Sequence, residues 1–302
     1  MGFVLLLIRL YLRALALVAP RVAGRRAYKI FSTPRTRRSV PPWAEDAMAE
    51  AEPLSFDVEG DEIQAYRWRP PEPDGAPRIV LMHGWESRGA RLAAWAGPLT
   101  EAGFEVVTLD GPAHGESGGK QADPVSFVRC MSALAREVGP FDGCVGHSLG
   151  GFSCLTAAAA PAVLFPDDDD GRAAEAHRER FRFRRAVVIA GAESGVDAMR
   201  MFCDILGLGQ SFAPLLLDGA AEQAGGPISS FDLHRTYPSC PIPTLWMHDP
   251  ADEDVALAAA ERVAATCGHV DLQQVHGLGH HKIVRDEDVI RRGVAFLSEI
   301  LR

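Results

Sequence analysis

The chain has 302 residues, enough for one large α/β domain with a full core or for two small domains. Hydrophobic residues make up 47% and charged residues 24%, a composition that excludes disorder over most of the chain. The net charge is −9, but residues 1–43 hold nine basic and no acidic residues, which leaves −18 for the remainder. This acidic body argues against nucleic acid as a partner.

The N-terminal extension, residues 1–43, begins with an apolar segment. Gly2–Val18 is interrupted only by Arg9 and Arg13, so no run reaches the length of a spanning helix, and the segment makes a poor signal peptide. The two arginines lie four residues apart and share one face of a helix. Such a helix either docks on the protein body or lies in a membrane interface, where the basic residues up to Arg38 would strengthen attraction to anionic lipid. Both interpretations stay open, so peripheral membrane contact through residues 1–38 is one expectation.

Strands and helices alternate through the rest of the chain, residues 44–302. The pattern predicts strands over 54–58, 62–68, Arg78–Met82, 104–109, 143–146, 186–190, Thr244–His248 and 270–275. It predicts helices over 90–102, Pro124–Val138, 150–160, 255–267 and 287–301, with Asp123 as the N-cap of the second. This alternation indicates βαβ units and an α/β fold with a mainly parallel sheet.

Two insertions interrupt the alternation. The first spans residues 161–185 and carries four aspartates at 167–170, which we interpret as a solvated loop. The second spans residues 194–238, lies between two predicted strands, and mixes apolar pieces with glycine and proline. We expect it to form a small helical cap over the carboxyl edge of the sheet.

Gly146-His147-Ser148-Leu149-Gly150 fits the pattern G-x-S-x-G between a predicted strand and a predicted helix. Such a turn needs glycine at 146 and 150 so that strand and helix can approach each other. It exposes the serine oxygen at the sheet edge and points the Leu149 N–H toward a reacting oxyanion. The pattern favours Ser148 as a nucleophile; the alternative is a tight turn with an inert serine.

From about residue 54 to its end, the chain resembles the α/β-hydrolase family. The resemblance is carried by Leu81-Met82-His83-Gly84-Trp85, Asp110-Gly111-Pro112-Ala113-His114-Gly115-Glu116-Ser117, the Ser148 turn, His248-Asp249-Pro250-Ala251-Asp252 and Gly277-Leu278-Gly279-His280. Five motifs in the family's order are far more specific than one. The resemblance implies an eight-stranded, mostly parallel sheet flanked by helices, with the catalytic residues on its loops.

The resemblance also implies roles for individual residues. The backbone N–H of Trp85 would be the second oxyanion donor beside Leu149. His280 would be the base, with His281 as its main competitor. We expect His83, His114 and His147 to be structural.

The acid of the triad is predicted from its place in the chain. Asp252 follows the strand Thr244–His248 and matches the family's acid position. Its neighbours Asp249 and Asp254 are close alternatives. Glu193 follows the preceding strand, where some family members place their acid.

The leading functional hypothesis is a carboxylesterase-like serine hydrolase that cleaves an ester, thioester or related acyl bond through an acyl-serine intermediate. Apolar residues of the cap suggest a small-molecule substrate with an apolar acyl group: Phe202, Leu206, Leu208, Phe212, Leu215, Leu216 and Leu217. A peptidase or C–C bond hydrolase on the same triad is an alternative, as is a non-catalytic binding protein of this fold.

The absence of a glycine loop and the spacing of the cysteines bear on cofactors and on the cellular compartment. The chain holds no phosphate-binding glycine loop, and its six cysteines form no C-x-x-C pair and no zinc-spaced group with histidine. We therefore predict no cofactor, no metal site, and reduced thiols in a cytoplasmic protein that is free or membrane-associated.

Overall fold

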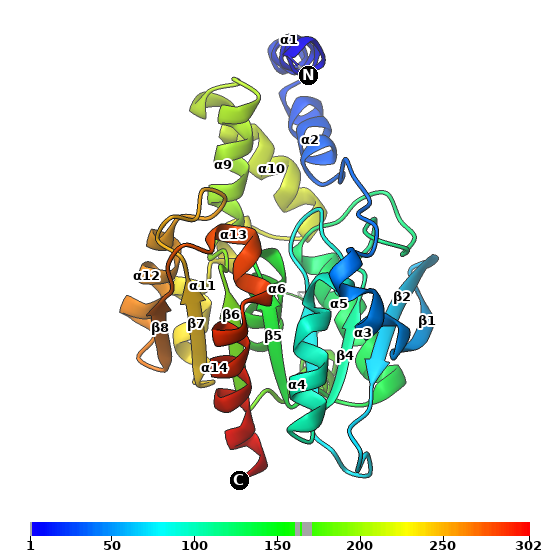
Figure 1. Ribbon diagram of the computed structural model, residues 1–302. Helices are drawn as coiled ribbons and strands as arrows, with labels where there is room; N and C mark the ends of the chain where they lie inside the picture. Colours follow the sequence, from blue (N-terminus) through cyan, green and yellow to red (C-terminus); the bar gives the residue numbers. More distant parts are fainter. Residues whose placement is uncertain (1, 161–163, 165–170) are drawn as a thin grey trace.

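The computed structural model describes residues 2–160, 164 and 171–302, so the aspartates at 167–170 lie outside the described residues. Figure 1 shows a central sheet between two layers of helices, with further helices stacked beyond one end of the sheet. The strands are β1 (Glu52–Val58), β2 (Asp61–Trp68), β3 (Arg78–Met82), β4 (Glu105–Leu109), β5 (Gly143–His147), β6 (Arg185–Ile189), β7 (Thr244–His248) and β8 (Val270–Gln274).

The eight strands form one sheet in the order β1-β2-β4-β3-β5-β6-β7-β8. β1 and β2 pair antiparallel, as do β2 and β4, and the other neighbours are parallel. The predicted eight-stranded, mostly parallel sheet is therefore confirmed. Because the strands from β3 to β8 run the same way, the loops that follow them gather at one edge of the sheet.

Both faces of the sheet are buried. Along β3, Val80 and Met82 point to one apolar cluster, while Ile79 and Leu81 point to the other. The first cluster is covered by α5 (Pro124–Val138), α6 (Leu149–Ala159), α11 (Leu233–Thr236) and α12 (Leu257–Thr266). The second is covered by α4 (Ala96–Glu101) and α14 (Glu287–Leu297). Burial on both faces explains the near-continuous apolar strands in the sequence.

Shorter elements complete the described chain. They are α3 (Glu45–Ala49), α8 (Arg172–Arg180) and α13 (Gly279–Lys282), with 3₁₀ turns at Pro42–Ala44, Gly89–Trp95, Gln210–Phe212, Ile228–Phe231, Tyr237–Ser239, Ile283–Arg285 and Ser298–Leu301. The helix predicted over 90–102 forms as a 3₁₀ turn followed by α4. Pro98 explains the difference: in the first turn of α4 its missing N–H is tolerated, but in a helix continuing from residue 90 it could not donate to the carbonyl of Ala94.

The start of α5 is as predicted. Asp123 Oδ1 accepts a hydrogen bond from the Ser126 N–H at 2.7 Å, and Ser126 Oγ accepts one from the Asp123 N–H at 2.9 Å. This is a capping box with serine in the place of the usual Glu or Gln. Pro124 occupies the first helical position, where a missing N–H costs nothing.

The cap lies between β6 and β7 and includes α9 (Gly195–Ile205) and α10 (Ala213–Ala224). Two N-terminal helices, α1 (Gly2–Val18) and α2 (Pro20–Phe31), pack on it and share its apolar cluster. The crossing of α2 and α10 is tight, because a Cβ on Gly24 would lie 2.1 Å from the Leu215 carbonyl oxygen. Gly219 meets the backbone of Gly24 in the same way. The N-terminal segment is thus docked on the protein body, mainly on its cap, and α2 also reaches the loop before α5 through the hydrogen bond from Tyr28 to Asp123. Among the described residues, no helix is both long and apolar enough to cross a bilayer.

A buried ion pair anchors the loop after β4. Arg88 is 3% exposed, and its Nη2 donates to Asp110 Oδ2 at 3.0 Å and to Glu116 Oε1 at 3.1 Å. Burial raises the pKa of Asp110, and the charge of Arg88 opposes that rise. The stability of the loop therefore depends on this ion pair, because removing either partner would leave the other as an uncompensated buried charge.

Replacing Arg88 with methionine should lower the free energy of unfolding by about 3 kcal/mol or more, because it leaves the Asp110 carboxylate buried without its cation. Urea unfolding followed by circular dichroism would measure the change. Arg67→Met is the matched control: Arg67 pairs with the half-exposed Glu52, and its loss should cost less than about 1 kcal/mol. Equal losses in the two variants would contradict the prediction.

Candidate active site

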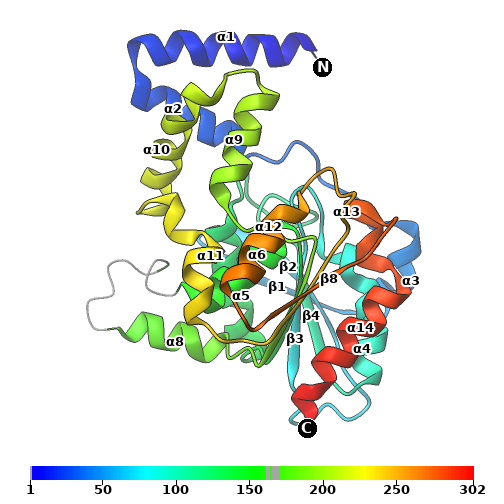
Figure 2. The same cartoon turned by 90° about the vertical axis from the view of Figure 1, so that its left-hand side faces the viewer.

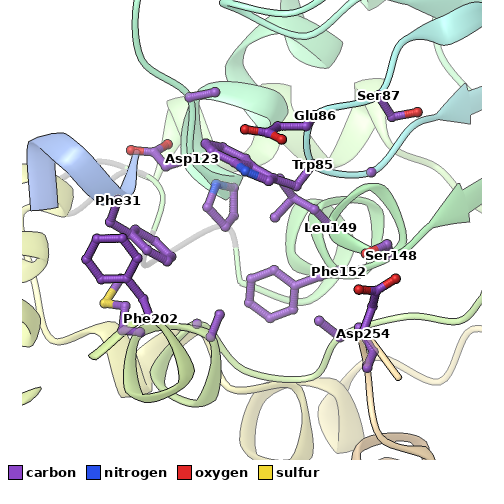
Figure 3. A pocket seen from close by; sticks show the side chains of 18 of the residues that line it. Phe31, Trp85, Glu86, Ser87, Asp123, Ser148, Leu149, Phe152, Phe202 and Asp254 are labelled. Carbon is purple, nitrogen blue, oxygen red and sulfur yellow. The ribbon is translucent and has the colours of Figure 1, made fainter. Parts of the chain in front are cut away.

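Ser148 lies on a strained turn between β5 and α6. Its φ is 53° and its ψ is −122°, a conformation that non-glycine residues seldom adopt. The flanking glycines are required by contact: a Cβ on Gly146 would lie 2.4 Å from Gly151 Cα, and one on Gly150 would lie 2.1 Å from the Met82 carbonyl oxygen. The turn thus places Ser148 at the carboxyl edge of the sheet, beside an open pocket (Figure 3).

His280 and Asp252 are brought together from two other loops at the same edge. His280 lies in α13 and donates through Nδ1 to Asp252 Oδ2 at 2.7 Å. The other carboxylate oxygen, Asp252 Oδ1, accepts the N–H groups of Asp254 and Val255 at 2.8 and 2.9 Å. Burial acts to raise the pKa of Asp252, but these hydrogen bonds outweigh it and hold that pKa below its usual value. Asp252 is therefore a carboxylate fixed against the imidazole of His280.

The three other acids considered from the sequence have different partners. Asp249 Oδ2 accepts the N–H groups of Leu278 and Gly279 at 2.6 and 2.7 Å, so it shapes the loop that carries His280. Glu193 pairs with Arg262, and the exposed Asp254 lies 3.5 Å from His281 Nε2. Of these four carboxylates, Asp252 alone hydrogen-bonds to His280 in the described chain.

The buried histidines near the site bond to backbone atoms. His147 donates through Nε2 to the carbonyl oxygen of His280 at 2.9 Å, which holds the main chain of that residue. His83 accepts the Gly111 N–H at Nε2, so its Nδ1 donates to the Gly84 carbonyl. Burial lowers the pKa of His83 to about 4 and that of His147 to about 3. These rings are neutral, structural groups at physiological pH.

His114 belongs to the same set. It accepts the N–H of Glu86 at Nε2, 3.0 Å away, and donates through Nδ1 to the Pro112 carbonyl at 2.8 Å. Burial lowers its pKa to about 3. It therefore ties the loop after β3 to the loop after β4.

The two predicted oxyanion donors flank Ser148. Leu149 is the first residue of α6, where the helix leaves its N–H groups without intrahelical acceptors. The backbone at Gly84, just before Trp85, lies close to Ser148: a Cβ on Gly84 would be 2.9 Å from Ser148 Cβ. Within the described chain, neither the Trp85 N–H nor the Leu149 N–H has an acceptor. Both amides are thus available to a ligand.

A cavity of about 520 Å³ opens beside Ser148. Apolar side chains line most of it, among them Phe31, Phe152, Met199, Phe202, Ile205 and Phe231. Figure 3 shows Phe31 and Phe202 together at one end of the cavity, and their rings meet edge to face at 5.3 Å. The cavity is therefore bounded by the sheet edge, the cap and the N-terminal helix α2.

The cap residues named from the sequence are mostly not part of this cavity. Of the seven, only Phe202 lines it. Leu206, Leu208, Phe212 and Leu216 are buried in the core between the cap and the N-terminal helices. Sequence reasoning also missed Phe31, whose place at the end of the amphipathic α2 was the available signal. The apolar acyl group therefore stays a prediction, and the residues that line the cavity are mostly not the ones on which the sequence based it.

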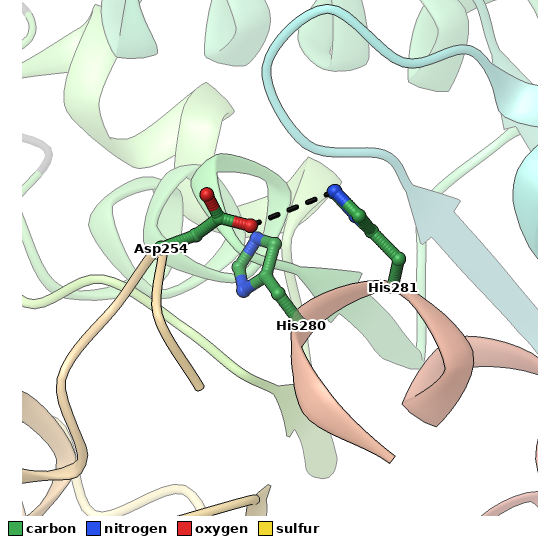
Figure 4. Close-up of side chains that lie close together, drawn as sticks. All are labelled: Asp254, His280 and His281. Atoms are coloured by element: carbon green, nitrogen blue, oxygen red, sulfur yellow. Dashed lines mark ion pairs between the residues drawn. The ribbon is translucent and has the colours of Figure 1, made fainter. Parts of the chain in front are cut away.

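Asp254, His280 and His281 lie together at the edge of the cavity (Figure 4). One ligand atom from each comes within 4.8 Å of the others, a spacing that could hold a metal ion. Because His280 Nδ1 already bonds to Asp252, a metal ion here would need Nε2 of the same ring. That nitrogen is the one a general base would use.

Comparison with known proteins agrees with this fold. The model of the alpha/beta hydrolase family matches residues 79–292. The chain is 26% identical, over 245 residues, to a pimeloyl-[acyl-carrier protein] methyl ester esterase of Xanthomonas campestris pv. campestris (strain B100), covering 71% of this chain and 92% of the relative. A second esterase of that name, from Xanthomonas axonopodis pv. citri (strain 306), is 27% identical over 244 residues, with the same coverage of both chains.

Solved structures show the same fold at lower identity. A membrane phospholipase A, described as a bacterial virulence factor, is 17% identical with a TM-score of 0.59, and the match covers 100% of this chain and 98% of that one. Alpha/beta hydrolase domain-containing protein 10 from mouse is also 17% identical, with a TM-score of 0.57 and coverage of 83% and 98%. With its sheet order, its serine turn and the match to the family model, the chain belongs to the α/β-hydrolase family.

Proposed function

We propose that this protein is a serine carboxylesterase that cleaves small esters or thioesters with an apolar acyl group. One observation carries the proposal: the His280–Asp252 hydrogen bond stands at the same apolar cavity as Ser148 on its strained turn. A nucleophile, a base and an acid that orients the base are the parts that acyl transfer through a serine requires. The name of the Xanthomonas relatives supports ester cleavage.

The mechanism gives each of these groups a defined role. His280 Nε2 takes the proton of Ser148 Oγ as the oxygen attacks the substrate carbonyl. The N–H groups of Trp85 and Leu149 stabilise the oxyanion, and one such donor is worth roughly 3–4 kcal/mol in related chemistry. His280 then gives its proton to the leaving alcohol or thiol, and a water molecule, activated by the same imidazole, releases the acid from the acyl-serine. Asp252 keeps the proton of His280 on Nδ1 throughout.

The compartment is part of the proposal. All six cysteines are unpaired, and five of them are buried. Reduced thiols are typical of a cytoplasmic protein, which supports the predicted location. The proposed mechanism uses side chains and backbone groups alone, so no cofactor is included in it.

Labelling with a fluorophosphonate probe tests the nucleophile. We expect the wild-type chain to label covalently, since the activated Ser148 Oγ attacks phosphorus as it would attack a carbonyl, and Ser148→Ala to remain unlabelled. Gel fluorescence with intact-protein mass measurement would read out both. An unlabelled wild type, or equal labelling of the two proteins, would reject Ser148 as the nucleophile.

A charge in the apolar part of the cavity should change the acyl preference. Ile205 lines the cavity and is 56% exposed, so Ile205→Asp should leave the fold intact. We expect kcat/KM for p-nitrophenyl octanoate to fall roughly tenfold while that for the acetate stays within about twofold, because the longer chain meets the new carboxylate. Leu301→Asp, a similarly exposed site outside the cavity, is the matched control. Parallel losses on both esters would place the acyl group elsewhere.

A further inference from the structure

Helix α1 is apolar on its inner and its outer side. Its inner residues Leu5, Ile8, Leu12 and Leu15 pack on the apolar cluster shared by α2 and the cap. Its outer face consists of Phe3, Val4, Leu6, Leu7, Leu10, Tyr11, Ala14, Leu17 and Val18, all exposed. Leu17 is 87% exposed and Phe3 is 71% exposed. This face is a continuous apolar surface that runs the length of the helix.

The two arginines of α1 point away from this face. Arg9 Nε donates to the Leu206 carbonyl oxygen at 2.6 Å, and Arg13 Nη2 donates to that of Gly207 at 2.8 Å. Both cations thus satisfy carbonyls at the C-terminal end of α9, where the helix dipole favours positive charge. They fix α1 on the cap in the orientation that turns its uncharged side outward.

Figure 2 shows α1 lying across the far end of the molecule, beyond α2, α9 and α10, with its outer side uncovered by other described elements. An apolar helix face of this length is normally buried in a protein core or in contact with lipid. Since no described helix could span a bilayer, α1 would lie in the plane of a membrane interface.

The charge near α1 favours an anionic surface. The exposed cations Arg21, Arg26 and Lys29 follow on α2, where Arg25 pairs with Glu222 of the cap, and residues 1–43 contain no acid. The rest of the chain has a net charge of −18, so the positive charge is concentrated next to the apolar face. A second copy of the chain docked through α1 would bring two such basic segments together. A membrane with anionic headgroups is therefore the better-matched partner.

We propose that the outer face of α1 inserts into the interface of an anionic lipid bilayer, with the cations of α2 at the headgroups. The same layer of helices borders the cavity, because α2 contributes Phe31 to its wall and α9 contributes Met201 and Ile205. Met201 and Ile205 are also exposed, at 49% and 56%. Membrane contact through α1 would hold this side of the cavity close to the lipid surface.

Vesicle co-sedimentation of the full chain tests the interface. We expect binding to vesicles of phosphatidylcholine and phosphatidylglycerol and weaker binding to phosphatidylcholine alone. Leu7→Ser, Leu10→Ser and Leu17→Ser combined should lower the partition coefficient by at least about tenfold, because each removes apolar area from the lipid contact. The matched control replaces the same three leucines with methionine and should bind like wild type. Wild type that stays in the supernatant, or serine and methionine variants that bind equally, would overturn the proposal.

The basic residues are tested separately. Arg21→Gln, Arg26→Gln and Lys29→Gln should each weaken binding to the anionic vesicles roughly fivefold and make it less sensitive to salt. Size-exclusion chromatography with light scattering tests the alternative that a second copy of the chain binds the outer face of α1, because it measures the oligomeric state. A dimer that the three serine substitutions dissociate, together with absent vesicle binding, would assign the α1 face to a second copy instead.

A consequence for substrate access rests on the proposed function. Hydrolysis of an ester embedded in anionic vesicles should fall about tenfold or more in the serine variant of α1, whereas hydrolysis of dissolved p-nitrophenyl acetate should be unchanged. Loss of activity on both esters would point to a damaged active site. No activity in either protein, with vesicle binding intact, would reject the esterase proposal and leave the membrane proposal standing.

Discussion

Replacing Ser148 with alanine should lower kcat for p-nitrophenyl butyrate by roughly 10⁴- to 10⁶-fold, the range seen when the nucleophile of a serine triad is removed. The reason is direct: the variant has no oxygen to form the acyl-enzyme, and only oxyanion binding and substrate positioning remain. Steady-state hydrolysis at several enzyme concentrations would measure the loss. The residual rate above the uncatalysed reaction is informative, since it reports what oxyanion binding by the Trp85 and Leu149 amides and substrate positioning contribute together.

Ser153→Ala is the matched control for this variant. Ser153 lies one turn along α6, is fully buried, and donates through Oγ to the Leu149 carbonyl at 2.8 Å. Its loss should cost about 1 kcal/mol of stability and change kcat by no more than a few-fold. If Ser148→Ala kept more than about a hundredth of the activity while its melting temperature matched wild type, another nucleophile would have to be sought.

Local signals in the sequence account for most of the sheet. Each strand is short and is followed within three residues by glycine, proline or aspartate, and the parallel strands alternate with segments of helical periodicity. The predicted boundaries of β3 and β7 agree with the structure, as do those of α5. The boundary of α4 does not, because Pro98 breaks a helix that the apolar pattern alone would continue.

The candidate site was also predictable only in part. Ser148, Asp252 and His280 follow strands whose carboxyl ends must meet, so their convergence at one edge follows from topology. The choice between Asp252 and Asp249 required coordinates, since both follow β7 and only hydrogen bonding separates their partners. Spacing along the chain does not reveal which carboxylate reaches across to the imidazole.

The cavity wall was the least predictable part. Leucine and phenylalanine that fill a core look the same in sequence as those that line a pocket, and the cap holds both kinds. Phe31 lies more than 100 residues before the cap in the sequence, so its contact with Phe202 depends on how α2 crosses α10. That crossing is set by close backbone contact at Gly24 and Gly219, two glycines with no local signal of their own.

Replacing Asp252 with asparagine should lower kcat by about 10³- to 10⁴-fold without changing the fold. The carboxylate accepts the Nδ1 proton of His280, whereas the amide of asparagine can present an N–H to the same atom. His280 would then carry its proton on Nε2, and that nitrogen could no longer accept the proton of Ser148. The substitution therefore removes the base by changing its tautomer, although every side chain keeps its place.

Three matched variants separate Asp252 from its neighbours. Asp254→Asn should stay within a few-fold of wild type, because Asp254 is exposed and pairs only loosely with His281. Asp249→Asn should act through the loop, with a lower melting temperature, since its carboxylate holds the N–H groups of Leu278 and Gly279. Glu193→Gln should likewise lower stability, because it removes the ion pair with Arg262.

The prediction would be contradicted if Asp252→Asn kept a tenth of the activity while Glu193→Gln or Asp249→Asn lost activity a thousandfold at unchanged stability. The acid of the triad would then be Glu193 or Asp249, and the hydrogen bond from His280 to Asp252 would be structural.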